Sequence, residues 1–556
     1  MAASSGRLLR RLGGRLNRSV WLARLLRLET SEGDPERPGL LLIQIDGLSR
    51  PQLERALARR ETPFLGRLMR REGYRLRSHY SGLPSTTPAV QAELFYGVRC
   101  AVPAFSFRDR ESGRMVRMYQ PEATTRMEKR NAANGRGLLT GGSAYADTAT
   151  GGAAEAHFCP SALGWGASLR AANPLVVAVF LLSNLYSFLR VAVLLFMELG
   201  LALADFVRGL LAGQDLIKEL KFVPTRVAIS ILLRELCVIG GKIDVSRGLP
   251  VVHINFLGYD EQAHRRGSRS LFAHWTLKGI DDAIARLWRA AQRSPWRRYQ
   301  VWLYSDHGQI AVAHYERVRG YSLEHAVSVS VDNLARGAPD QTSPRSMESI
   351  QTQRVRFLGG KRLQRLFRVV GIYSEDTDPK RPRVAALGPV GHIYLPPRLA
   401  SGTGCERLAG ELAQRHGVPL VLTAAGRGRV RAFAGDVEFE LPRDRGRLFG
   451  AGHPFLDAIG EDVVRLCGHP EAGDIVVLGW RDGVDPLTFA LENGAHGGAS
   501  PDETHGFALL PAGAPLPTAG PAYVRPLTLR RAALRYLGRP ADGAVAGSAQ
   551  APEAPG

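Results

Sequence analysis

The sequence predicts a three-layer α/β/α fold with a mostly parallel central sheet and an apolar helical insertion. Three apolar runs with strand character each lead into an acidic residue: 39–45 before Asp46, 248–257 before Asp260, and 299–304 before Asp306. Segments with helical spacing of apolar residues follow two of them, at 53–72 and 271–291. Strands that alternate with helices form parallel sheets covered on both faces, and ligands bind where such strands end.

Size and charge set limits on the function. The chain has 556 residues, 45% of them hydrophobic, which is enough for an enzyme with a large core. Its net charge of +21 favours partners that carry phosphate, but no nucleic-acid-binding motif is present, so we expect no sequence-specific nucleic-acid binding. Five widely spread cysteines argue against a disulfide framework and against a thiolate zinc cluster.

Residues 1–37 are expected to form a basic N-terminal arm, since residues 1–28 hold seven arginines and no acid. This arm is either an amphipathic helix on an anionic membrane surface or a disordered or locally packed segment. It lacks an apolar core of secretory-signal length, so we expect the catalytic domain to face the cytoplasm.

Residues 38–170 and 225–537 are expected to form two parts of one catalytic domain, interrupted by the apolar insertion at 171–224. The most apolar stretch is 174–209, where Arg190 and Glu198 leave neither half with the ~20 apolar residues of a spanning helix. We expect the insertion to dip into or lie on a membrane, with a two-pass hairpin or a buried helical pair as alternatives. Region 311–480 is less readable, and 538–556 is expected to be a disordered tail.

Residues of metal-ligand type gather at the predicted strand ends and turns. Asp260 and His264 are four apart and face one way on a helical turn, and a Thr-Thr-Pro sequence begins a helix at Pro88. Three carboxylates and three histidines form a mixed oxygen and nitrogen set that suits Zn²⁺ or Mn²⁺ better than calcium or copper. The candidates are Asp46, Thr86 or Thr87, Asp260, His264, Asp306, His307 and His496.

These motifs, including Ser305-Asp306-His307-Gly308 and Gly494-Ala495-His496-Gly497, occur in the order typical of the alkaline phosphatase superfamily. The chain resembles its nucleotide pyrophosphatase/phosphodiesterase-like branch over residues 38–125, 245–315 and 485–512. The resemblance implies two metal ions. One would be held by Asp260, His264 and His496, and the other by Asp46, Asp306, His307 and a nucleophilic threonine.

The resemblance leaves the nucleophile open. Counting back from Pro88 selects Thr86, whereas counting back from Gly97 at the end of the helix selects Thr87, which we prefer. The asparagine that relatives place soon after the nucleophile is missing; Arg108 or Arg110 could contact the substrate phosphate, or be ordinary surface residues. His505 could support the metal ligands from outside the coordination sphere, or act as a ligand in place of His496.

The expected activity is that of a metal-dependent phosphohydrolase, acting on phosphodiesters or phosphomonoesters through a phosphothreonine intermediate. One alternative is a transferase that moves phospho-headgroups at a membrane. A second is a membrane-associated binding protein that holds the metals without catalysis.

Overall fold

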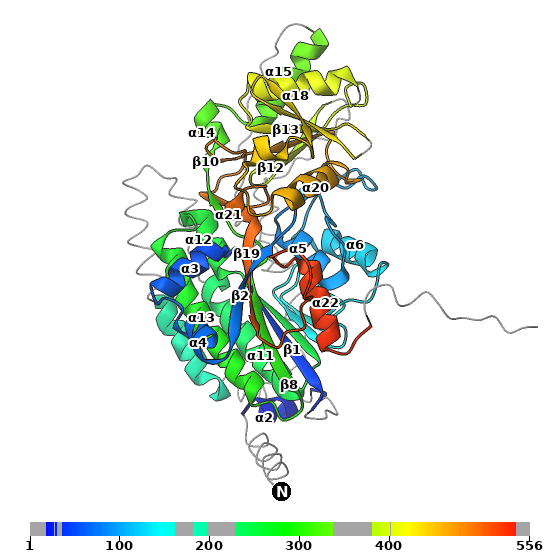
Figure 1. The fold of residues 1–556 in the computed structure, drawn as a ribbon. Coiled ribbons are helices and arrows are strands. Elements are labelled where there is room, and N and C mark those ends of the chain that lie inside the picture. Colours follow the sequence, from blue (N-terminus) through cyan, green and yellow to red (C-terminus); the bar gives the residue numbers. More distant parts are fainter. Residues whose placement is uncertain are drawn as a thin grey trace, which may run out of the picture.

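The computed structural model describes residues 18–26, 28–30, 36–161, 182–196, 228–336, 381–400, 402–426 and 428–540. The described chain forms a larger lobe around one sheet and a smaller lobe around a second sheet (Figure 1). All five cysteines lie in the described part and are buried, and none of them forms a disulfide, in agreement with the sequence argument against a disulfide framework. Residues 1–17, most of the predicted insertion and the predicted tail from 541 onward lie outside the described residues.

The central sheet of the larger lobe has seven strands in the order β2-β19-β8-β1-β7-β5-β6. Six of these strands run in the same direction and only β19, between β2 and β8, runs in the opposite direction. The prediction of a mostly parallel sheet is therefore confirmed. The strands are β1 (Pro38–Ile45), β2 (Tyr74–Tyr80), β5 (Ser143–Tyr145), β6 (Glu155–His157), β7 (Val251–Phe256), β8 (Arg298–Tyr304) and β19 (His505–Pro511).

Helices cover both faces of this sheet, which confirms the three-layer architecture. Alternate residues of β1 face opposite layers: Leu41 and Ile43 pack with one group of helices, and Leu40 and Leu42 with the other. The first layer contains α3 (Arg50–Ala58), α4 (Pro63–Arg71), α11 (Arg234–Arg247), α12 (Gly258–Arg266) and α13 (Leu271–Gln292). The second contains α5 (Thr87–Tyr96), α6 (Pro121–Ala132) and α22 (Pro526–Tyr536).

The smaller lobe is built on a six-stranded antiparallel sheet within the region that was hard to read from the sequence. Its strand order is β11-β12-β16-β13-β14-β15. The strands are β11 (Arg383–Ala386), β12 (Val390–Tyr394), β13 (Leu420–Ala424), β14 (Val430–Ala434), β15 (Val437–Leu441) and β16 (Ile475–Leu478). Its helices are α15 (Leu323–Arg336), α18 (Thr403–Gln414), α19 (Arg445–Phe449) and α20 (Leu456–Cys467).

Short elements connect and extend the lobes. They are β3 (Ser106–Arg108), β4 (Met115–Arg117), β9 (Ile310–Ala311), β10 (Ala313–His314), α14 (Tyr315–Arg319), β17 (Leu487–Thr488), β18 (Gly494–Ala495) and α21 (Pro501–Thr504). A buried carboxylate on α20, Asp462, accepts hydrogen bonds from Tyr80 (3.0 Å), Arg99 (2.6 Å) and Arg525 (3.0 Å) of the larger lobe. The buried carboxylate of Asp462 therefore joins the two lobes through hydrogen bonds, two of them with arginine side chains.

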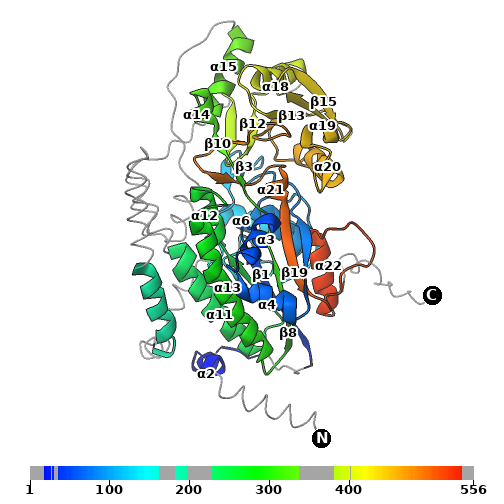
Figure 2. The same ribbon diagram turned by 60° about the vertical axis from the view of Figure 1, so that its left-hand side comes forward.

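The described parts of the N-terminal arm and of the insertion lie beside α11. Helix α2 (Arg18–Leu25) buries Leu22 and Ala23 against Ile239 and Ile243 of α11, so this part of the arm is locally packed. Residues 182–196 are helical apart from a turn at residue 184 and stand on the outer side of α11 and α13 (Figure 2). Within the described residues, every helix is too short or too polar to cross a membrane.

One prediction concerns the packing of α4 on α13. The carboxylate of Asp281 accepts hydrogen bonds from the backbone N–H groups of Phe64 and Leu65, both at 2.9 Å, in the first turn of α4. Asp281→Ala would leave these buried donors unpaired and should lower the free energy of unfolding by roughly 1–3 kcal/mol in urea denaturation. The adjacent Asp282→Ala removes partly exposed ion pairs and should cost about 0–1 kcal/mol. Equal losses in the two variants would contradict this role.

Candidate active site

Three carboxylates meet at the carboxyl edge of the central sheet. Asp46 directly follows β1, Asp306 lies two residues after β8, and Asp260 lies in the first turn of α12, which follows β7. Because β8, β1 and β7 are adjacent and parallel, their ends bring these acids together. All three side chains are fully buried.

Gly47 makes this close approach possible. Its backbone has φ +72°, and a Cβ atom there would lie 2.6 Å from Asp260 Oδ1. Its N–H group donates to Asp306 Oδ1 at 3.3 Å, so one backbone amide is already directed at the acids. A side chain at this position would be strained and would displace Asp260.

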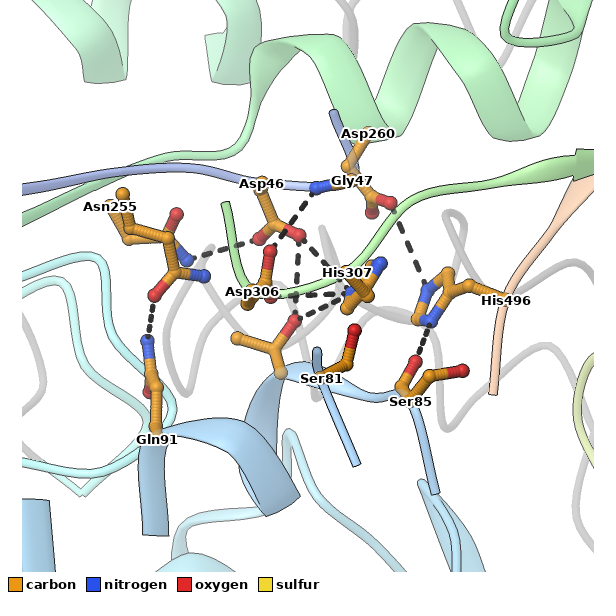
Figure 3. Close-up of polar contacts among 12 residues, drawn as sticks. Asp46, Gly47, Ser81, Ser85, Gln91, Asn255, Asp260, Asp306, His307 and His496 are labelled. Atoms are coloured by element: carbon orange, nitrogen blue, oxygen red, sulfur yellow. Dashed lines mark hydrogen bonds and ion pairs between the residues drawn. The ribbon is translucent and has the colours of Figure 1, made fainter. Parts of the chain in front are cut away.

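The three predicted histidine ligands direct the same ring atom toward the acids. Nε2 of His307 lies 3.2 Å from Asp306 Oδ2 and 3.6 Å from Asp46 Oδ1. Nε2 of His264 lies 3.3 Å from Asp260 Oδ2, and Nε2 of His496 lies 3.8 Å from Asp260 Oδ1. The rings of His307 and His496 are stacked, with centroids 3.7 Å apart (Figure 3).

Backbone carbonyl groups fix the orientation of these rings. Nδ1 of His307 lies 3.0 Å from Gly308 O, and Nδ1 of His264 lies 2.9 Å from Gly494 O. Nδ1 of His496 lies 3.0 Å from Ser85 O. Since a carbonyl oxygen only accepts, each Nδ1 carries a proton, and in a neutral ring Nε2 is then available to coordinate a metal ion, which is the arrangement of a metal-ligating histidine.

The donor atoms fit divalent cations. Two sets have ligand atoms that all lie within 4.8 Å of one another: Asp260, His307 and His496, and Asp46, Asp306 and His307. In the part of the chain that the structure describes, buried His264 Nε2 and Asp306 Oδ2 make ion-pair contacts of 3.3 and 3.2 Å but no well-formed hydrogen bond. Buried polar atoms normally have a hydrogen-bond partner, and a cation would supply a partner here. A mixed set of carboxylates and imidazoles suits Zn²⁺ or Mn²⁺.

The pKa shifts within the cluster show how strongly its charged groups affect one another. Burial, together with the charge of Asp260, raises the pKa of Asp306 to about 7. Burial lowers the pKa of His496 well below its ordinary value, with the neighbouring His307 acting in the same direction. Burial opposes the charged form of His264, but the charges of Asp260 and Glu492 raise its pKa well above its ordinary value. A bound cation would favour the ionised carboxylates and the neutral rings that coordination requires.

Thr87 joins this cluster, whereas Thr86 does not. Thr87 Oγ1 lies 3.4 Å from Asp46 Oδ1 and 3.3 Å from His307 Nε2, and Thr87 is the first residue of α5. Thr86 Oγ1 is buried and has no hydrogen-bond partner among the described residues. Ser85 Oγ donates to Gly498 O and accepts from the N–H of Gly497, so it holds the loop that carries His496.

The structure brings all seven preferred candidates together and places three secondary candidates elsewhere. The side chain of Arg108 donates to Gly113 O at 3.3 Å, and that of Arg110 donates to Ala472 O at 3.4 Å. Nε2 of His505 lies 3.0 Å from Ser78 Oγ. These contacts lie outside the cluster of acids and histidines.

Three further residues support the cluster and were not identified from the sequence. Asn255 Nδ2 donates to Asp46 Oδ2 at 3.0 Å, and Gln309 Nε2 donates to Asp260 Oδ1 at 2.5 Å. Glu492 Oε2 lies 2.8 Å from Nδ1 of His264. Asn255 could have been found from the sequence, because it is a polar residue near the end of an apolar strand. Nothing in the sequence around Gln309 or Glu492 indicates their contacts with the cluster.

Comparisons with known proteins give structural similarity alone. No family model matches the chain, and no curated protein matches it. The chain is similar to phosphonoacetate hydrolase from Sinorhizobium meliloti 1021 in complex with phosphonoformate, at 13% identity and a TM-score of 0.43, over 91% of this chain and 96% of that one. It is also similar to murine ectonucleotide pyrophosphatase/phosphodiesterase 5, at 9% identity and a TM-score of 0.44, over 90% of this chain and 95% of that one.

The geometry predicts which histidine is needed for metal. We expect His496→Ala to lose one equivalent of bound zinc relative to the unsubstituted chain, as measured by inductively coupled plasma mass spectrometry after dialysis. His505→Ala is the control and should keep the full metal content, because its ring contacts Ser78. Loss of metal in His505→Ala together with full content in His496→Ala would reverse the assignment.

Proposed function

We propose that this protein is a metal-dependent phosphoric ester hydrolase that uses Thr87 as its nucleophile. The observation that carries the proposal is the position of Thr87 Oγ1, within 3.4 Å of Asp46 and His307 at the start of a helix. An unaided threonine hydroxyl is a poor nucleophile at neutral pH and needs such surroundings.

The proposed ligand sets are those that the sequence motifs imply. Asp260, His264 and His496 would hold one divalent ion, and Asp46, Asp306, His307 and Thr87 would hold the other, with Zn²⁺ or Mn²⁺ as the fitting metals. Bound there, the ions would lower the pKa of the hydroxyl and neutralise the charge that develops on the phosphoryl group. A ligand atom of His307 lies within 4.8 Å of ligand atoms of Asp260 and His496 and also of Asp46 and Asp306, which supports two neighbouring ions.

The residues of the chain would act on both the nucleophile and the phosphate. Asp46 and His307 orient the oxygen of Thr87, and the N-terminal amides of α5 lie where the phosphoryl oxygens of a substrate would bind. A bond would form between Thr87 Oγ1 and phosphorus while the bond to the leaving oxygen breaks. Water would then release phosphate or a phosphomonoester from the phosphothreonine.

Turnover assays separate this proposal from a metal-holding protein without catalysis. The metal-loaded chain should hydrolyse p-nitrophenyl phosphate or bis-p-nitrophenyl phosphate, and chelator should abolish the reaction. The ratio of the two rates distinguishes a monoesterase from a diesterase. Turnover of neither compound by protein that holds two equivalents of metal would contradict the hydrolase proposal.

Variants at two adjacent positions, 86 and 87, test which threonine is the nucleophile. Thr87→Ala should reduce kcat/KM by roughly 10³-fold or more, because it removes the attacking oxygen, while most of the metal content is kept. Thr87→Ser should retain part of the activity. Thr86→Ala is the matched control and should stay within about tenfold of the unsubstituted chain, and the opposite pattern would assign the role to Thr86.

A further inference from the structure

The helical residues 182–196 expose a continuous apolar side to the outside of the larger lobe. Six large apolar side chains, spaced three or four residues apart, are 49% to 76% exposed. We name this set the outer stripe: Leu182, Leu185, Tyr186, Leu189, Val193 and Phe196. Such spacing places them on one face of a helix.

The inward side of the same helix carries both polar and apolar contacts. Asn184, Ser187 and Val191 are buried, and the side chain of Arg190 lies 2.6 Å from Asp282 Oδ2 on α13. A helix on the surface of a soluble protein normally has polar residues on its outer side, where this helix has apolar ones. An exposed apolar area of this kind marks a binding surface.

Neighbouring elements extend this surface. Phe188 packs against the cluster formed by Leu22 of α2 and Ile239 of α11, so α2 lies beside the helix that carries the outer stripe (Figure 2). Trp21, half exposed, and Arg24, also exposed, lie three residues apart on the outer side of α2. Tryptophan and arginine together are typical of protein surfaces at the membrane–water interface.

The charges around the outer stripe favour an anionic partner. Lys278 and Arg289 are exposed on α13, four residues before and seven residues after Asp282. Asp282 itself is paired with Arg190 and Arg286, and the buried Glu235 is also paired with Arg286, so these acids are neutralised. The exposed charge that remains on this stretch of α13 is positive and complements anionic lipid.

The sequence around the stripe agrees with a lipid partner rather than a soluble one. Residues 174–189 contain no charged residue, and the whole chain has a net charge of +21. We propose that the outer stripe, with Trp21 and the basic residues beside it, is a docking surface that lies in the interface of an anionic membrane. This inference rests on the surface of the larger lobe and is independent of the proposed activity.

A fluorophore on an introduced cysteine tests the proposal directly. All five native cysteines are buried, so Val193→Cys can be labelled selectively with the environment-sensitive dye NBD. With the full chain and vesicles of phosphatidylcholine and phosphatidylglycerol, NBD emission at position 193 should increase severalfold and shift to shorter wavelength. Pure phosphatidylcholine vesicles should give a much weaker response.

Val437→Cys is the matched control, since Val437 is an exposed valine of the smaller lobe. Its label should give the same emission with and without vesicles. Three results would overturn the proposal: no response at position 193, a shifted emission before vesicles are added, or a shift that depends on protein concentration alone. The second result would assign the outer stripe to another segment of this chain, and the third to a second copy.

Discussion

The structure of the candidate site depends most on the burial of three carboxylates close to one another. Asp46, Asp260 and Asp306 are fully buried at the end of three adjacent strands. Removing ionised carboxylates from water costs several kcal/mol each unless opposite charge compensates. The chain surrounds them with imidazole rings whose Nε2 atoms are directed inward, and this donor set suits a bound metal ion as the compensating charge.

Much of the surrounding structure fixes these groups in place. Gly47 allows Asp260 to approach β1, and carbonyl groups of separate segments hold the Nδ1 atoms of the histidines. Gln91, one turn after Thr87, donates to Gln44 of β1 and to Asp147, which anchors α5 against the sheet. Across the site, Val390 of the smaller lobe comes close to Gly497, next to His496: a Cβ atom at Gly497 would lie 3.6 Å from Val390 Cγ2. Residues from both lobes thus define the position of the site.

The sequence predicted the site better than it predicted its surroundings. Apolar runs that end in acids and the helical spacing of Asp260 and His264 are local patterns, and the parallel sheet makes them converge. The contacts of Gln309 and Glu492 depend on how distant loops pack, which no local pattern contains. The smaller lobe was missed as a unit because its strands of four or five residues pair across long separations. Composition found the apolar insertion but could not show which side of its helix faces outward.

The most direct test of the account is to locate the phosphoryl group during turnover. The metal-loaded chain would be mixed with p-nitrophenyl phosphate, quenched in acid and digested, and the peptides sequenced by mass spectrometry. The geometry predicts phosphate on Thr87 and on no other residue of the Ser85-Thr86-Thr87 segment. Phosphate on Ser85 or Thr86, or rapid turnover with no phosphorylated threonine at any time after mixing, would contradict it.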